Sequence, residues 1–144
     1  MTIHAVIDTN VLVSSLLTKN KKAATTRLVD ALIDDVFCPV YNNDIIEEYC
    51  EVLSRKEFKF EKEVVEGLIG TIRQNGLYAE RTPANEPVID PKDVAFYEVA
   101  LSKEGAYLVT GNLKHFPRKP IVVTPAEMIK ILEDNGLIEK EEQA

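Results

Sequence analysis

The sequence predicts an α/β fold with three layers, in which helices cover both faces of a mainly parallel central sheet of about five strands. Two observations predict it. Short runs rich in β-branched residues alternate along the chain with segments of helical periodicity. These runs are almost wholly apolar, as in parallel strands that are covered on both faces, rather than alternately apolar and polar.

The first half of the chain alternates in this way from its first residues. The expected elements are, in order, a strand at 3–7, helices at 11–17 and 23–33, a strand at 36–40, and helices at 44–53 and 61–74. Asn42 or Asn43 is a suitable cap for the helix at 44–53. The pair Asn75-Gly76 is a stop signal for the helix at 61–74.

The second half continues the pattern on both sides of a loop with two prolines at 81–87. The expected elements are a short strand at 77–80, a helix from about 90 to 103, strands at 106–109 and 121–123, and a last helix between Pro125 and Asn135-Gly136. Proline is favoured at the first position of a helix, which places Pro91 and Pro125 at two helix starts.

Length and composition are those of a globular protein. The 144 residues are close to the ~150 residues of one domain, so we expect a single domain over 1–144, with a flexible acidic tail at 137–144. Apolar runs are too short for a membrane span, and the start lacks the pattern of a signal peptide. We therefore expect a cytoplasmic protein.

The net charge is −7, from 17 basic and 24 acidic residues, which at first argues against a nucleic-acid partner. The acids are unevenly distributed, however. Residues 133–144 hold five acids and one base and contribute −4, so the rest of the chain carries only −3. Three metal-bound carboxylates would account for that remainder. A polyanionic substrate is therefore compatible with the charge.

Asp8 follows the first expected strand directly and is itself followed by Thr9 and Asn10. The carboxyl ends of strands are where open α/β sheets keep their ligand sites. Asp, Thr and Asn are also good caps for the helix that comes next. On this segment alone, both the ligand and the capping interpretation stay open.

Two further acids are candidates for the same site. On the helix at 44–53, Glu48 lies at the edge of the apolar stripe, whereas Glu47 and Glu51 lie opposite it. A glutamate with a buried stem and a solvated head is the structural alternative for Glu48. Asp93 is a first-turn acid that faces the helix dipole and can also point toward a neighbouring cleft, while Asp90 suits the cap.

Thr110-Gly111-Asn112 repeats the opening pattern, since polar groups again follow a buried strand. An ordinary turn is the alternative. If Asp8, Glu48 and Asp93 converge, three pairs of like charges ~4 Å apart would cost on the order of 12 kcal/mol, comparable to the whole stability of a domain. Proton uptake or a bound cation must offset that cost, and oxygen ligands favour Mg²⁺ or Mn²⁺.

These residues resemble the PIN domain family of nucleases, and more narrowly the ribonuclease toxins of toxin–antitoxin pairs. Four segments in chain order carry the resemblance: residues 6–14 (VIDTNVLVS), 45–53 (IIEEYCEVL), 90–100 (DPKDVAFYEVA) and 108–112 (LVTGN). The resemblance implies an endonuclease that cuts RNA phosphodiester bonds with Mg²⁺ or Mn²⁺. It also implies an antitoxin protein as partner, and often a homodimer.

The resemblance assigns Asp8, Glu48 and Asp93 as catalytic metal ligands. Asn10 and Thr110 would orient these ligands or hold metal-bound water. The chain departs from the family pattern at Asn112, where most members carry a fourth acid. An amide oxygen can bind a hard cation but brings no charge, which puts metal affinity and turnover in question.

Basic loops after the strand-end motifs are candidates for RNA contact. They contain Lys19, Lys21 and Lys22, and then Lys114, His115, Arg118 and Lys119. Solvated loop charge is the alternative. Two other functions stay open: an inactive PIN fold that binds RNA or a protein, and a domain with a phosphorylated aspartate. The second is disfavoured because Asp8 has no second acid beside it.

Overall fold

The computed structural model describes residues 2–88 and 90–140. Within them five strands form one sheet in the order β3-β2-β1-β4-β5, and every neighbouring pair is parallel. The strands are β1 (His4–Ile7), β2 (Cys38–Tyr41), β3 (Leu77–Tyr78), β4 (Tyr107–Val109) and β5 (Val122–Val123). The predicted parallel sheet of about five strands is therefore confirmed.

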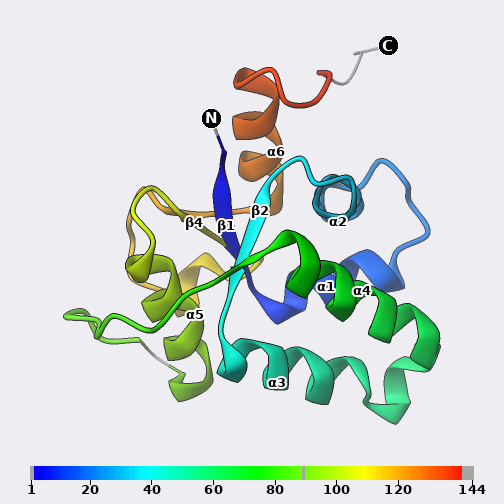
Figure 1. The fold of residues 1–144 in the computed structure, drawn as a ribbon, viewed down its shortest axis with the longest axis horizontal. Coiled ribbons are helices and arrows are strands. Elements are labelled where there is room, and N and C mark those ends of the chain that lie inside the picture. The colour runs from blue at the N-terminus through cyan, green and yellow to red at the C-terminus, as the bar shows by residue number, and fades with distance from the viewer. Residues whose placement is uncertain (1, 89, 141–144) are drawn as a thin grey trace.

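Helices cover both faces of this sheet (Figure 1). They are α1 (Thr9–Leu17), α2 (Ala24–Ile33), α3 (Asn43–Leu53), α4 (Lys62–Asn75), α5 (Pro91–Ser102) and α6 (Pro125–Asp134), with short 3₁₀ helices η1 (Lys56–Phe58) and η2 (Leu113–His115). Helix α5 packs on β1, β2 and β4, and lies on the opposite side of these strands from α1, α2 and α4. The predicted three layers are confirmed.

The strand order reverses at β1, in the middle of the sheet. From β1 the chain leads to β2 on one side, whereas β4 lies on the other side of β1 and leads on to β5. Such a reversal leaves a crevice at the strand ends, which is the usual ligand site of open α/β sheets. Helix α3 runs across this edge, and the first turns of α1 and α5 also lie there (Figure 1).

The predicted strand boundaries differ from the structure by at most two residues, at the end of β3, which stops at Tyr78 rather than at residue 80, and at the start of β2. The second strand was expected at 36–40 but begins at Cys38. The preceding residues instead close α2: Asp35 has a φ of 59°, and the Val36 amide donates to the Ala31 carbonyl at 2.9 Å. Such a left-handed turn satisfies the last carbonyls of a helix, so the apolar side chains of 36–37 belong to this turn.

Side-chain caps define the starts of α3, α5 and α6. Asn42 caps α3 by accepting a hydrogen bond from the Ile45 amide, and Asp90 caps α5 through the Lys92 amide. Thr124 and Glu127 form a reciprocal capping box at the start of α6. Position 76, directly after α4, has no room for a side chain, because a Cβ there would lie 2.4 Å from the Ile72 carbonyl oxygen.

The C-terminal part of the chain is only partly described. Residues 137–140, which follow α6, form neither helix nor strand. The remainder of the predicted acidic tail, 141–144, lies outside the described residues. No helix in the described part of the chain is long and apolar enough to cross a bilayer.

Candidate active site at the carboxyl edge of the sheet

Asp8 occupies the point where β1 ends and α1 begins. Its side chain is buried, with 4% of the residue exposed. Although Asp8 stands at the cap position of α1, its carboxylate makes no capping hydrogen bond. The Thr110 hydroxyl, at the end of β4, instead donates to Asp8 Oδ2 at 2.8 Å. The capping interpretation therefore does not explain this carboxylate.

Thr110 orients the Asp8 carboxylate. The fully buried Thr110 hydroxyl accepts a hydrogen bond from the Asn112 amide at 3.0 Å, so its own proton is directed at Asp8. Burial still raises the pKa of Asp8 above its ordinary value, and the charge of Glu48 raises it further. The Thr110 hydroxyl and the nearby amides of Thr9 and Asn10 act in the opposite direction.

Glu48 and Tyr49 reach the site from α3. Glu48 is half-buried, whereas the neighbouring Glu47 is exposed, as the helical periodicity predicted. The buried Tyr49 hydroxyl donates to the carbonyl of Ile7, the residue before Asp8. Tyr49 also packs against Phe96 of α5, with ring centroids 6.1 Å apart. Tyr49 thus ties α3 to β1 and to α5 next to Glu48.

Asp93 enters from the first turn of α5. Burial raises its pKa to about 6, with further contributions from the charges of Asp8 and Asp90. His115 opposes this shift, since its Nδ1 lies 3.4 Å from Asp93 Oδ2. This oxygen is buried and forms no hydrogen bond of good geometry in the described structure. Asp93 is therefore a buried acceptor with an incomplete set of partners.

The three acids influence one another electrostatically, with Asp8 in the middle. The charge of Glu48 raises the pKa of Asp8, and the charge of Asp8 raises the pKa of Asp93. As the side chains stand, residues 2–88 and 90–140 hold no group of three acidic, histidine or cysteine side chains arranged as a metal site. The fold thus places the acids at one edge, without a finished coordination sphere.

A groove of about 400 Å³ between α3 and α5 extends from Glu48; we call it the α3–α5 groove. Its lining holds four acids and two bases: Asp44, Glu47, Glu48 and Glu51, with Arg81 and Lys92; Pro91, Ala95 and Phe96 complete it. Four acids against two bases leave it net negative, so the groove favours cations over a polyanion.

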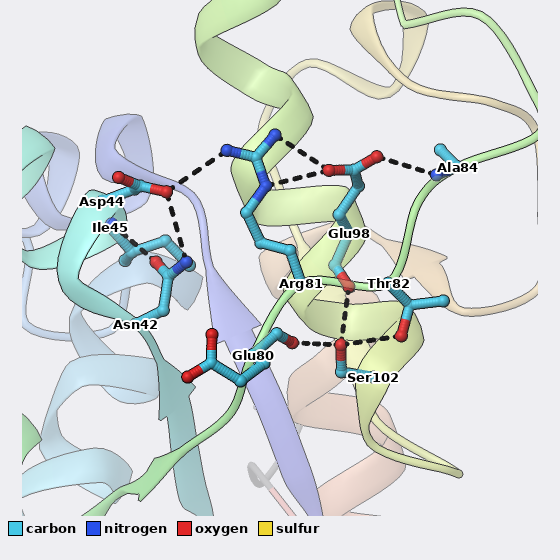
Figure 2. Close-up of polar contacts among 9 residues, drawn as sticks. All are labelled: Asn42, Asp44, Ile45, Glu80, Arg81, Thr82, Ala84, Glu98 and Ser102. Carbon is cyan, nitrogen blue, oxygen red and sulfur yellow. Dashed lines mark hydrogen bonds and ion pairs between the residues drawn. The ribbon is translucent and has the colours of Figure 1, made fainter.

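Arg81 bridges the two helices that form this groove (Figure 2). Its guanidinium contacts Asp44 of α3 at 3.2 Å and Glu98 of α5 at 2.8 Å. Glu98 also accepts a hydrogen bond from the Ala84 amide at 2.7 Å. Arg81 and Glu98 therefore fasten the loop after β3 to α5, and Arg81 links both to the start of α3.

A second cavity, of about 330 Å³, lies beside η2; we call it the η2 pocket. Its lining consists of the basic residues Lys114, Arg118 and Lys119 and the apolar residues Leu113, Phe116, Pro117 and Val122. The α3–α5 groove is lined by both acids and bases, whereas the charged residues that line the η2 pocket are all basic. His115, which contacts Asp93, lies within the same segment of chain.

The PIN domain family model matches residues 4–114 of this chain. The chain belongs to the PIN domain family. PIN domains are nucleases, commonly metal-dependent ribonucleases. Comparison with curated proteins and with solved structures gave no match. The matched range contains Asp8, Glu48 and Asp93, whereas most of the η2 pocket follows its end at residue 114.

The other predicted site residues lie at differing distances from the acids of this PIN domain. The Asn112 backbone joins the site through Thr110, but its side chain makes no hydrogen bond in the described structure. Asn10 is exposed and likewise makes no side-chain hydrogen bond there. Lys19 follows the far end of α1, whose nine residues separate it from Asp8 by about 13 Å of helix.

Sequence reasoning does not find two residues of the site, Tyr49 and Arg81. Tyr49 was assigned only to the apolar stripe of its helix, because its hydroxyl partner on β1 is remote in sequence. Arg81 stood in a loop marked only by prolines, and its partners on α3 and α5 are equally remote. His115 is a predicted candidate for RNA contact, and the structure places it in η2 beside Asp93. A tyrosine directly after a candidate acid was the one usable signal.

Proposed function

We propose that this PIN domain is an endoribonuclease that uses Mg²⁺ or Mn²⁺ to hydrolyse RNA phosphodiester bonds. The observation that carries the proposal is the buried Asp8 carboxylate at the carboxyl edge of the sheet. It accepts a directed hydrogen bond from Thr110 and is flanked by Glu48 and Asp93, with no lysine or arginine paired to it in the described residues.

The donor set fits a hard divalent ion. Asp8, Glu48 and Asp93 supply carboxylate oxygens, which Mg²⁺ and Mn²⁺ prefer. Asp93 Oδ2 is a buried acceptor without a well-formed hydrogen bond, and the raised pKa values of Asp8 and Asp93 show that negative charge is disfavoured there. A divalent cation would give Asp93 Oδ2 a partner and would offset the unfavourable negative charge of Asp8 and Asp93. Asn112 would add a neutral oxygen in place of a fourth acid.

The chain's own residues would fix the orientation of these ligands. Thr110 holds Oδ2 of Asp8, while Tyr49 fixes α3 against the end of β1. His115 stands next to Asp93, where it can donate to that carboxylate. A divalent ion, when bound, supplies an activated water and neutralises charge on the phosphate.

We propose that the protein is the toxin component of a toxin–antitoxin pair in the cytoplasm, with RNA as substrate and an antitoxin as protein partner, and that it pairs as a homodimer. The support is the resemblance of the four sequence segments to such toxins. Growth arrest on expression, relieved by a gene product encoded beside it, would test this role.

The test of activity compares wild type with the isosteric Asp8→Asn on single-stranded RNA in Mn²⁺. We expect Asp8→Asn to lower the cleavage rate by at least ~1,000-fold, because it removes the central charge of the ligand set. Asp30→Asn, which removes an exposed carboxylate from α2, is the matched control and should cleave normally. Folding of both variants is checked by circular dichroism.

Two results would contradict the proposal: no cleavage by the folded wild type with any divalent ion, or equal cleavage by Asp8→Asn. The first result would favour a second function, an inactive PIN fold that binds RNA or a protein. Asn112 motivates that alternative, since it removes one charge from the family's acidic set.

A further inference from the structure

The η2 pocket carries a charge opposite to that of the whole chain. Three of its lining residues are basic and none is acidic, in a protein with a net charge of −7. Concentrated positive charge on an acidic protein attracts a polyanion to one place and leaves the rest of the surface repulsive to it. The pocket is therefore a specific feature rather than part of a general basic surface.

Two of these cations are not used by the fold. Lys114 and Arg118 are exposed and make no ion pair or hydrogen bond with their side chains among the described residues. Lys119 has one distant partner, Glu86, at 3.8 Å. Their charges are thus available to a ligand, in contrast to that of Arg81.

The remaining lining of the pocket is apolar. Leu113 is 43% exposed although it is a large hydrophobic residue, and Phe116 is buried beneath the same segment. Pro117 and Val122 complete the surface. The volume of about 330 Å³ is at the small end of the ~300–1,000 Å³ typical of ligand pockets. Such a cavity suits one flat ring system with an attached phosphate.

The pocket is connected to the acids through η2. This helix begins directly after Asn112, and its last residue, His115, lies 3.4 Å from Asp93. Lys114 and Phe116, the neighbours of His115 in sequence, both line the pocket. A strand of RNA whose phosphate lies at the acids therefore has an adjacent cavity within reach.

We propose that the η2 pocket binds one nucleotide of the RNA strand beside the scissile phosphate, with Lys114 and Arg118 on the phosphates and Leu113 against the base or ribose. This inference rests on the proposed ribonuclease function. The α3–α5 groove, which Glu48 lines, is net acidic and disfavours the strand, so the η2 pocket is the cationic cavity that suits it. Phosphate contacts set affinity and the apolar contact adds to it.

The experiment measures binding of a fluorescein-labelled single-stranded oligouridylate of eight nucleotides to the full chain in EDTA, where metal-dependent cleavage is absent. Fluorescence anisotropy at several salt concentrations gives the dissociation constant and its salt slope. The test variants are Lys114→Ala/Arg118→Ala and Leu113→Ala. The control Lys56→Ala/Lys130→Ala removes two exposed charges from η1 and α6.

We expect the Lys114→Ala/Arg118→Ala variant to bind at least tenfold more weakly, with a salt slope reduced by about 1.4, because each single-strand phosphate contact contributes about 0.7. Leu113→Ala should bind about fourfold more weakly with an unchanged slope, as for loss of roughly one buried methylene. The control should bind as wild type does.

Equal affinity of the Lys114→Ala/Arg118→Ala variant and the control would overturn the proposal. Wild-type affinity of Leu113→Ala would overturn the nucleotide pocket and leave only a basic surface, such as one that docks an acidic protein. Because binding is measured without metal, its outcome is separate from that of the cleavage test. A protein that binds through the pocket but never cleaves would contradict the ribonuclease proposal alone.

Discussion

Two cationic regions border the candidate active site, and the protein uses their charges differently. Arg81, in the loop after β3, is paired with Asp44 on α3 and with Glu98 on α5. Lys114 and Arg118, in the loop after β4, make no ion pair among the described residues. The first region holds helices together, whereas the second presents free charge beside the acids.

The acids around the site likewise fall into a paired and an unpaired group. Asp44 and Glu98 are both paired with Arg81, and hydrogen bonds from the Ala84 amide and from Arg81 lower the pKa of Glu98. Asp8 and Asp93 have no such cation except the partial contact of His115, and their pKa values are raised. Paired charges thus hold elements of this fold together, while the unpaired charges at the sheet edge are the ones available to the proposed metal.

The largest effect after loss of Asp8 is expected from Thr110→Val, which keeps the shape of Thr110 but removes its hydroxyl. Asp8 Oδ2 would lose its directed hydrogen bond at 2.8 Å. Changes to groups that orient a metal ligand typically cost ~10–100-fold in affinity or activity, and we expect a loss of that size in Mn²⁺ affinity by isothermal titration calorimetry. Thr71→Val on α4 is the control. An unchanged affinity would place Asp8 outside the metal site.

A pH effect of intermediate size distinguishes the unpaired acids from the paired ones. The pKa of Asp93 is raised to about 6, so a proton must leave it before an ion binds. We expect Mn²⁺ affinity to fall about tenfold for each pH unit below 6. Asp93→Asn should weaken this dependence. An affinity that stays constant between pH 5 and 7 would contradict the assignment of Asp93.

The raised pKa of Asp93 also affects the stability of the metal-free protein, which, unlike the metal affinity, is favoured by low pH. A carboxyl whose pKa is raised on folding stabilises the fold while it is protonated, and that contribution is lost as the pH rises through about 6. The melting temperature in EDTA should therefore decrease between pH 4 and pH 6.5 relative to that of Asp93→Asn. Added Mn²⁺ should restore stability at the higher pH.

The smallest effect is expected from Arg81→Ala. Arg81 is partly exposed, with 39% of its side chain accessible, and exposed ion pairs contribute only ~0–1 kcal/mol. We expect a loss of about 1 kcal/mol in the free energy of unfolding by urea denaturation and less than a threefold change in RNA affinity. A loss of RNA affinity as large as that of Lys114→Ala/Arg118→Ala would show that Arg81 also binds RNA.

Much of the fold was predictable because its signals are local. Apolar runs gave the strands, and Asn42, Asp90, Pro91 and Pro125 marked helix starts through local hydrogen bonds or a fixed φ. The start of β2 was not predictable, since the apolar residues 36–37 belong to the turn that closes α2. That turn depends on a positive φ at Asp35, for which the sequence carries no glycine signal.

The candidate site was predictable only in part. Asp8 and Thr110 follow strands that are neighbours in the sheet, so their proximity follows from the strand order. Glu48 was distinguished from Glu47 by its place beside the apolar stripe. The bridge from Arg81 to Asp44 and Glu98, and the hydroxyl of Tyr49 on Ile7, join segments 17 to 42 residues apart. No periodicity or spacing encodes such pairs.

The most direct test of this account is a crystal structure of the protein with Mn²⁺, in which anomalous scattering locates the ion. We predict an ion bound by Asp8, Glu48 and Asp93, with the Asn112 side-chain oxygen turned toward it and the Arg81 bridge unchanged. An ion bound instead among Asp44, Glu47 and Glu51 of the α3–α5 groove, with Asp8 still bound only by Thr110, would contradict it.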